Sequence, residues 1–221
     1  MSITRIISIA NSKGGVGKSS VTMFLAVALA MDKNKRVLIL DTDSQRTIGD
    51  YYEGEVEDDN GAVTVEAIAP QRVHNFIARW GSDYDFIFID IPRLTAKAAE
   101  KNILSVLNCC DSVLIPVTGS QIDLLSTLDF ITIMEGVKND RKADGLKFKY
   151  YGFLNRRNRR KEHEETANYL KDSNLKMFDS SLKDLKIFSN PSLVESILNS
   201  KEGEKRFLPF YNEFLKAFKI K

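Results

Sequence analysis

Short apolar runs alternate with segments of helical spacing along most of the chain. The runs predict five buried strands, at Arg5–Ala10, Arg36–Leu40, Phe86–Ile89, Ser112–Val117 and Phe148–Leu154. Apolar residues three or four positions apart predict helices that start near Ser19 and that cover Val73–Trp80, Ala96–Leu107, Leu124–Val137 and Glu162–Leu170. Continuous apolar strands between such helices are typical of a mostly parallel, twisted sheet covered by helices on both faces. We therefore predict an α/β fold.

Length and composition narrow the class of protein. A chain of 221 residues with 43% hydrophobic content can bury one sizeable core, so we expect a single domain over residues 1–221. No leader-like segment opens the sequence and no apolar stretch approaches the roughly 20 residues that span a bilayer, so we expect a cytoplasmic protein. The acidic stretch Tyr51–Gly61 predicts a surface loop. The net charge of +2 is too small to indicate nucleic-acid binding by itself.

Glycines and lysines fill the segment between the first predicted strand and the helix that follows it. This segment reads Ser12-Lys13-Gly14-Gly15-Val16-Gly17-Lys18-Ser19-Ser20. Glycines let the backbone turn its N–H groups toward an anion, and the start of the helix adds the positive end of its dipole. The spacing fits the phosphate-binding loop G-x-x-x-x-G-K-[ST], except that Ser12 stands where the first glycine is expected. A strand, this loop and a helix together predict a P-loop NTPase rather than a glycine-rich turn.

The loop residues have distinct expected roles. Lys18 would hold the β- and γ-phosphates, Ser19 would place its hydroxyl on Mg²⁺, and Ser20 would reach the α-phosphate. The backbone that cradles the phosphates belongs to Gly14, Gly15, Val16 and Gly17.

The second lysine of the loop, Lys13, makes the motif unusual. The sequence K-G-G-V-G-K-S resembles the ParA/MinD family of deviant Walker A ATPases, and short ParA-type partition ATPases most of all. The resemblance implies ATP and Mg²⁺ as cofactors and a homodimer in the ATP state. It also implies that Lys13 reaches across the dimer interface to the nucleotide bound by the partner subunit.

A carboxylate follows the third predicted strand. Four apolar residues and then Asp90 form a Walker B pattern, in which Asp90 binds Mg²⁺ directly or through water. The family usually continues with a small residue and two prolines, whereas here Ile91 is large and Arg93 replaces the second proline. Two interpretations of Arg93 stay open: a contact to phosphate or the other subunit, or an ordinary surface arginine.

Two more carboxylates follow the second predicted strand. The segment Asp41-Thr42-Asp43-Ser44-Gln45 resembles the D-x-D-P-Q segment of ParA proteins, with Ser44 in place of the proline. The resemblance implies that Asp43 orients and activates the hydrolytic water and that Asp41 supports the Mg²⁺ shell through water. The alternative is that both aspartates cap a turn.

The fifth predicted strand is followed by an asparagine and a basic cluster. Asn155 matches the asparagine that contacts adenine in the nitrogenase iron protein and its ParA relatives, although asparagine is also an ordinary turn former. The cluster consists of Arg156, Arg157, Arg159, Arg160 and Lys161. Such a density of cations can follow DNA phosphates without reading bases, as ParA-like dimers do, or it can be a solvated basic loop.

These features favour a partition or positioning ATPase that binds nonspecific DNA, and the resemblance to the ParA/MinD family implies that a ParB-like or other adaptor protein stimulates it. A MinD-like membrane function is an alternative, because Phe207, Tyr211 and Phe214 share a face of a basic C-terminal segment; the same face could pack on the sheet. A metal-cluster or metabolic ATPase is less favoured, since the adjacent Cys109 and Cys110 lack metal-ligand spacing.

Overall fold

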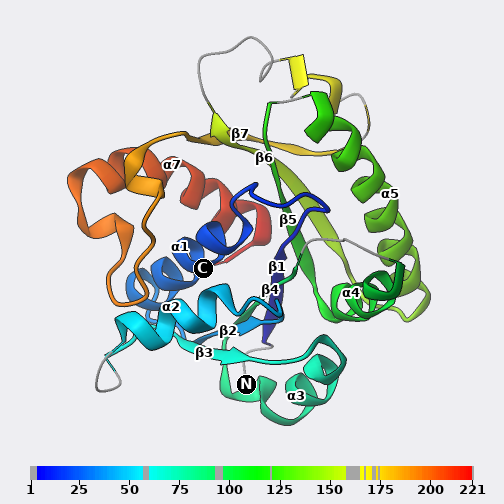
Figure 1. Ribbon diagram of the computed structural model, residues 1–221, viewed down its shortest axis with the longest axis horizontal. Helices are drawn as coiled ribbons and strands as arrows, with labels where there is room; N and C mark the ends of the chain where they lie inside the picture. The colour runs from blue at the N-terminus through cyan, green and yellow to red at the C-terminus, as the bar shows by residue number, and fades with distance from the viewer. Residues whose placement is uncertain are drawn as a thin grey trace.

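The computed structural model is an α/β sandwich built on one seven-stranded sheet (Figure 1). It describes residues 4–56, 60–92, 97–119, 121–157, 165–166, 168–170, 173 and 175–220. The strands are β1 Arg5–Ile9, β2 Val37–Asp41, β3 Thr64–Ala67, β4 Phe86–Asp90, β5 Ser112–Val117, β6 Lys149–Arg157 and β7 Met177–Lys183. The helices are α1 Lys18–Asp32, α2 Thr47–Glu55, α3 Val73–Trp80, α4 Lys97–Cys109, α5 Gln121–Ala143 and α7 Lys201–Phe218.

The strand order is β3-β2-β4-β1-β5-β6-β7, and every neighbouring pair is parallel. Helices cover both faces of the sheet: α1, α2 and α7 pack on one face, and α3, α4 and α5 pack on the other (Figure 1). This arrangement confirms the predicted fold class. It also places the carboxyl ends of β1, β2 and β4 side by side, where an open α/β sheet binds its ligands.

Alternating side chains of the central strands supply both cores. In β4, Phe86 and Phe88 pack toward α1 and α7, whereas Ile87 and Ile89 pack toward α3, α4 and α5. All five residues of this strand are buried, which explains why the sequence shows a continuous apolar run there rather than an alternating one.

All five predicted strands are present, with small changes at their ends. Asp41 and Asp90 are themselves the last residues of β2 and β4 instead of following them. Of the helix predicted over Glu162–Leu170, the described residues 165–166 and 168–170 are helical.

Three elements were not predicted. The stretch Tyr51–Gly61, predicted to be a loop, begins inside α2, which continues to Glu55. The short strand β3 at the sheet edge and the polar strand β7 at the opposite edge also lay outside the prediction.

The aromatic face of the C-terminal helix is buried against the sheet. Phe207, Phe210, Tyr211 and Phe214 of α7 are each at most 1% exposed. Phe210 lies 4.8 Å from Phe153 of β6, measured between ring centroids. This face therefore packs in the core, which is the structural alternative considered for it. Among the described residues, no helix is both long and apolar enough to cross a membrane.

Candidate nucleotide site

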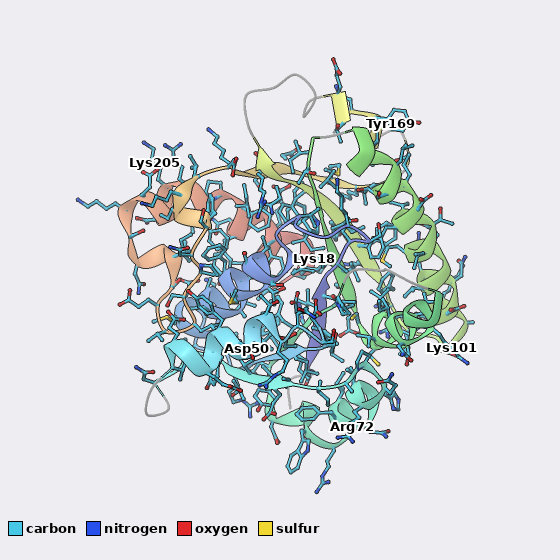
Figure 2. The ribbon with its side chains drawn as sticks, viewed as in Figure 1. Lys18, Asp50, Arg72, Lys101, Tyr169 and Lys205 are labelled. Carbon is cyan, nitrogen blue, oxygen red and sulfur yellow. The ribbon has the colours of Figure 1, made fainter. Side chains whose placement is uncertain are left out.

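The glycine-rich loop joins β1 to α1 at the carboxyl edge of the sheet, and Lys18 is the first residue of the helix (Figure 2). Gly15 and Gly17 have φ angles of +74° and +88°, in the left-handed region that favours glycine. At Gly17 space is also limiting, since a Cβ atom there would lie 2.3 Å from Nδ2 of Asn155. The sequence places glycines where this turn needs them.

Two side chains of the loop tie it to the backbone of neighbouring elements. Asn11 donates from Nδ2 to the carbonyl oxygen of Pro116 at 2.9 Å, and its Oδ1 accepts the backbone N–H of Lys13 at 3.2 Å. Ser12 donates from Oγ to the carbonyl oxygen of Ser126 in α5 at 2.9 Å. The backbone that carries Lys13 is thus tied to the end of β5 and to α5. Sequence reasoning gave Asn11 no role, although it lies next to the motif.

The lysine of the motif spans the loop. Nζ of Lys18 donates to the carbonyl oxygen of Lys13 at 3.0 Å. This contact holds the ammonium group within the turn formed by the glycines, which is where a bound phosphate group would meet it.

The carboxylate of Asp90 lies beside the serine of the loop. Asp90 is 2% exposed, and its Oδ2 accepts a hydrogen bond of 2.7 Å from Oγ of Ser19. Its Oδ1 is buried and has no hydrogen-bond partner among the described residues. Burial raises the pKa of Asp90 to about 7, and the charges of Asp41 and Asp43 act in the same direction, while the Ser19 hydrogen bond and the Lys18 charge oppose them. A cation at Oδ1 would offset the cost of burying the ionised carboxylate and would lower its pKa.

Both oxygens of Asp41 accept backbone N–H groups. Oδ2 accepts from Ile48 at 2.9 Å and from Gly49 at 3.0 Å, in the first turn of α2, and Oδ1 accepts from Asp43 at 3.1 Å. Asp41 therefore stabilises the start of α2, where an acceptor and a negative charge are both favourable. This agrees with the capping alternative, and the role in the Mg²⁺ shell stays a prediction.

Asp43 is less enclosed than the other two aspartates. It is partly buried, and its Oδ1 accepts the backbone N–H of Gln45 at 3.0 Å. Its charge contributes to the raised pKa of Asp90, which places the two carboxylates in the same site. Across the described residues, no group of three or more His, Cys, Asp or Glu is arranged to hold a metal ion, so protein carboxylates alone do not form a cage.

A cavity of about 250 Å³ opens next to the loop. Asn155, at the end of β6, is buried and donates from Nδ2 to the carbonyl oxygen of Val16 at 2.7 Å. The cavity is lined by residues of the glycine-rich loop, α1, the end of β6, the end of β7 and the segment that follows β7: Gly17, Ser20, Val21, Phe24, Asn155, Arg156, Leu182, Lys183, Asp184, Leu185, Phe188 and Ser189. The residues from Leu182 onward were not anticipated, because the strand that leads to them was not.

The basic cluster divides between this cavity and a segment that the structure does not describe. Arg156 lines the cavity and has a φ angle of +52°. Arg157 ends β6, whereas Arg159, Arg160, Lys161 and also Arg93 lie outside the described residues. The predicted DNA contacts of this cluster therefore stay a prediction, and Arg156 is placed toward the cavity.

The loop between β1 and α1, with Lys18 and Ser19 at the start of the helix and Asp90 at the end of the adjacent strand, defines a P-loop nucleotide-binding protein of the α/β class. Comparison with known families then narrows this class. The chain belongs to the CobQ/CobB/MinD/ParA nucleotide-binding domain family, whose sequence model matches residues 7–200.

Solved structures share the fold over nearly the whole chain. A plasmid partition protein from Borrelia burgdorferi is 21% identical, with a TM-score of 0.66 over 97% of this chain and 99% of that one. A complex of Cyanothece McdA with ATP is 16% identical, with a TM-score of 0.79 over 100% and 98%. MinD in the MinC:MinD cell division complex of Aquifex aeolicus is 20% identical, with a TM-score of 0.70 over 96% of each chain.

Proposed function

We propose that this chain is an ATP-dependent, dimerising ATPase of the ParA type that positions or partitions a DNA or other cargo with the help of an adaptor protein. The observation that carries the proposal is the pair formed by Ser19 and Asp90 beside the P-loop. A buried carboxylate with one unpartnered oxygen, next to the hydroxyl of the loop serine, is the donor set that an Mg²⁺–nucleotide complex needs.

The residues present fit Mg²⁺. Ser19 and Asp90 would hold the ion, since hydroxyl and carboxylate oxygens are its preferred protein ligands and phosphate oxygens and waters complete its shell. When bound, Mg²⁺ neutralises charge on the β- and γ-phosphates. Lys18 adds a fixed positive charge to the same phosphates, and Asp43 would orient the attacking water.

The cavity beside Asn155 is suited to the base of the nucleotide. Its lining includes Gly17 of the loop and the apolar side chains of Leu182, Leu185 and Phe188, which can pack on a flat ring. Nδ2 of Asn155 is used by the loop, so its Oδ1 is the atom available to accept from an exocyclic amine. This orientation supports a preference for adenine.

The proposed dimer depends on Lys13. Its backbone lies on the loop itself, braced by Asn11, so its amine can serve a second subunit only if the two sites face each other. ATP would then act as the ligand that stabilises the dimer, and hydrolysis would release it. Two states with different partners are what a positioning cycle requires.

Neither alternative function gains an observation of its own. The aromatic face of α7 that a membrane helix would need is buried in the core. Cys110 is fully enclosed, and burial raises the pKa of its thiol well above the ordinary value, which disfavours the thiolate that ligates metal clusters. We therefore propose that DNA is the partner of the ATP-bound state and that the protein binds it through the basic cluster within residues 156–161.

The test is binding of a fluorescent random-sequence DNA duplex to the purified protein with ATP and Mg²⁺, with ADP, or without nucleotide, at several salt concentrations. We expect sequence-indifferent binding that requires ATP and weakens steeply with salt. Arg159→Glu with Arg160→Glu should abolish it, whereas the matched pair Lys142→Glu with Lys147→Glu, on exposed residues elsewhere, should retain it. Binding to anionic lipid vesicles without binding to DNA would refute the proposed output.

A further inference from the structure

The edge strand β7 pairs irregularly with β6. Gly152 pairs with Met177 and Leu154 with Ser181, so β7 advances by four residues where β6 advances by two. The extra residues of this bulge include Asp179 and Ser180. A bulge leaves backbone groups without partners in the ladder and so needs another source of hydrogen bonds.

A single carboxylate supplies them. Oε1 of Glu213, in α7, accepts the backbone N–H of Asp179 at 2.8 Å, and Oε2 accepts both the backbone N–H of Ser180 at 2.8 Å and its hydroxyl at 2.5 Å. Hydrogen bonds to an ionised acceptor are among the stronger ones in proteins. The helix and the strand lie next to each other at this edge of the sheet (Figure 1).

Aromatic packing fixes the helix that carries Glu213. One turn before it, Phe210 lies 4.8 Å from Phe153 of β6 and 5.8 Å from Phe178 of β7, between ring centroids. Both Phe210 and Phe214 are fully buried. The carboxylate therefore reaches the bulge from a rigid position, so it can specify where along β7 the bulge falls.

The residues after the bulge line the cavity, and the pairing is adjusted once more among them, because β6 advances by three residues from Leu154 to Arg157 while β7 advances by two from Ser181 to Lys183. Leu182 is 1% exposed and, together with Lys183, Asp184 and Leu185, lines the cavity beside the end of β6. A slip of the strand by one residue would turn Leu182 to the opposite face of the sheet and bring the polar Ser181 or the charged Lys183 in its place. The shape of this wall thus depends on the register that the bulge sets.

We propose that Glu213 is a positioning residue for the base of the nucleotide: by fixing the bulge in β7 it sets the register of Leu182–Leu185 and hence the contribution of the base to nucleotide affinity. This inference rests on the proposed function, in which the cavity holds the base. It assigns no contact between Glu213 and the ligand. The phosphate end of the site, built on β1, α1 and β4, is independent of it.

The test compares the dissociation constants of ATP and of inorganic tripolyphosphate, each with Mg²⁺, by calorimetry. Their ratio measures what the nucleoside adds to the phosphates. In Glu213→Ala, we expect ATP to bind about tenfold more weakly while tripolyphosphate stays within about twofold of wild type. Glu213→Gln keeps one acceptor oxygen and cannot accept with its amide nitrogen, so it should fall in between. Amide hydrogen exchange at Asp179 and Ser180 should accelerate in both variants.

Glu204→Ala is the matched control, because Glu204 is an exposed acid in the first turn of the same helix. Removing it perturbs α7 without touching β7, so both dissociation constants should stay within about twofold of wild type. Equal weakening of ATP and tripolyphosphate in the Glu213 variants, or no change in either, overturns the inference. If Glu213→Ala does not fold, Glu213→Gln decides alone. If the wild-type protein binds ATP no more tightly than tripolyphosphate, the cavity does not hold the base. That result would overturn both the proposed base cavity and this inference.

Discussion

Replacing Asp90 by asparagine should make the stability of the ligand-free protein less sensitive to pH. The free energy of unfolding of the variant, relative to that of the wild type, should be higher at alkaline pH than at acid pH. The carboxyl group has its ordinary pKa of 3.8 in the unfolded chain, whereas burial raises the pKa to about 7 in the folded protein. The folded state therefore binds this proton more tightly. The Asp90 carboxyl therefore lowers the free energy of unfolding of the wild type as the pH rises from about 4 to about 7. Outside this pH range its contribution does not change with pH.

The size of the effect follows from the shift. One pKa unit corresponds to about 1.4 kcal/mol, so the full window represents roughly 4 kcal/mol, of which about 3 kcal/mol lies between pH 5 and pH 8. Asparagine carries no charge and can still accept from Ser19, but its amide group leaves a buried donor that costs about 1–3 kcal/mol at every pH. The pH-dependent difference between variant and wild type isolates the carboxylate from that constant cost.

Urea unfolding followed by circular dichroism, at pH 5 and pH 8 with chelator and without nucleotide, measures this difference. The free energy of unfolding of Asp90→Asn relative to wild type should rise by about 3 kcal/mol between the two pH values. Asp83→Asn, an exposed acid just before the same strand, serves as the control and should show little change. A relative stability of Asp90→Asn that is the same at both pH values would show that the carboxylate is not held in a desolvated site.

Two further predictions concern the loop and the last helix. Lys13→Gln should slow ATP turnover and prevent ATP-dependent dimerisation, measured by light scattering, while the affinity of the monomer for ATP changes little. Lys142→Gln is the control for loss of an exposed lysine. Normal turnover by Lys13→Gln would refute the role of Lys13 across the dimer interface. Gly203→Ala should destabilise the protein by about 1–3 kcal/mol, because the new Cβ would lie 1.9 Å from the carbonyl oxygen of Ile197. Gly136→Ala in α5 has no atom within 4 Å of its Cβ and should instead stabilise by about 0.5–1 kcal/mol, so a common sign for both glycine variants in thermal unfolding would contradict the steric reasoning.

Hydrophobic pattern was enough to locate the central strands and most helices. In β4 both faces are covered, so the strand appears as an uninterrupted apolar run that needs no knowledge of its neighbours. The edge strands lack this signature. In β3, three of the four residues are exposed, and β7 contains the polar sequence Asp179-Ser180-Ser181 where the bulge forms. These edge strands are stabilised by pairing with a neighbouring strand, and the local hydrophobic pattern does not indicate such pairing.

Helix α2 illustrates a second limit. Its residues from Thr47 to Glu55 include two glycines and three acids, a composition that favours a loop. The helix begins where Asp41, six positions earlier, accepts two N–H groups of its first turn. A cap contributed from a neighbouring strand cannot be found by searching the residue just before a helix.

The phosphate end of the candidate site could be anticipated in more detail than the base end, for a physical reason. Phosphate binding uses backbone N–H groups within one contiguous loop, so its requirements leave a compact motif in the sequence. The proposed base cavity is assembled from α1, the ends of β6 and β7 and the segment after β7, and its walls are ordinary residues such as Leu182 and Phe188. Only their juxtaposition makes them a site.

The polar residues that the motifs identify also hold the site together. Asp41 anchors the start of α2, and Asn155 ties the carbonyl oxygen of Val16 to the end of β6. Because Nδ2 of Asn155 is bonded to the phosphate loop while its Oδ1 faces the base cavity in the proposed arrangement, one side chain joins the two ends of the nucleotide site. Loss of that amide would therefore disturb phosphate binding as well as base recognition, whereas loss of Glu213 should disturb the base end alone. Comparing the two losses therefore distinguishes Asn155, which links the two ends of the site, from Glu213, which positions a single wall.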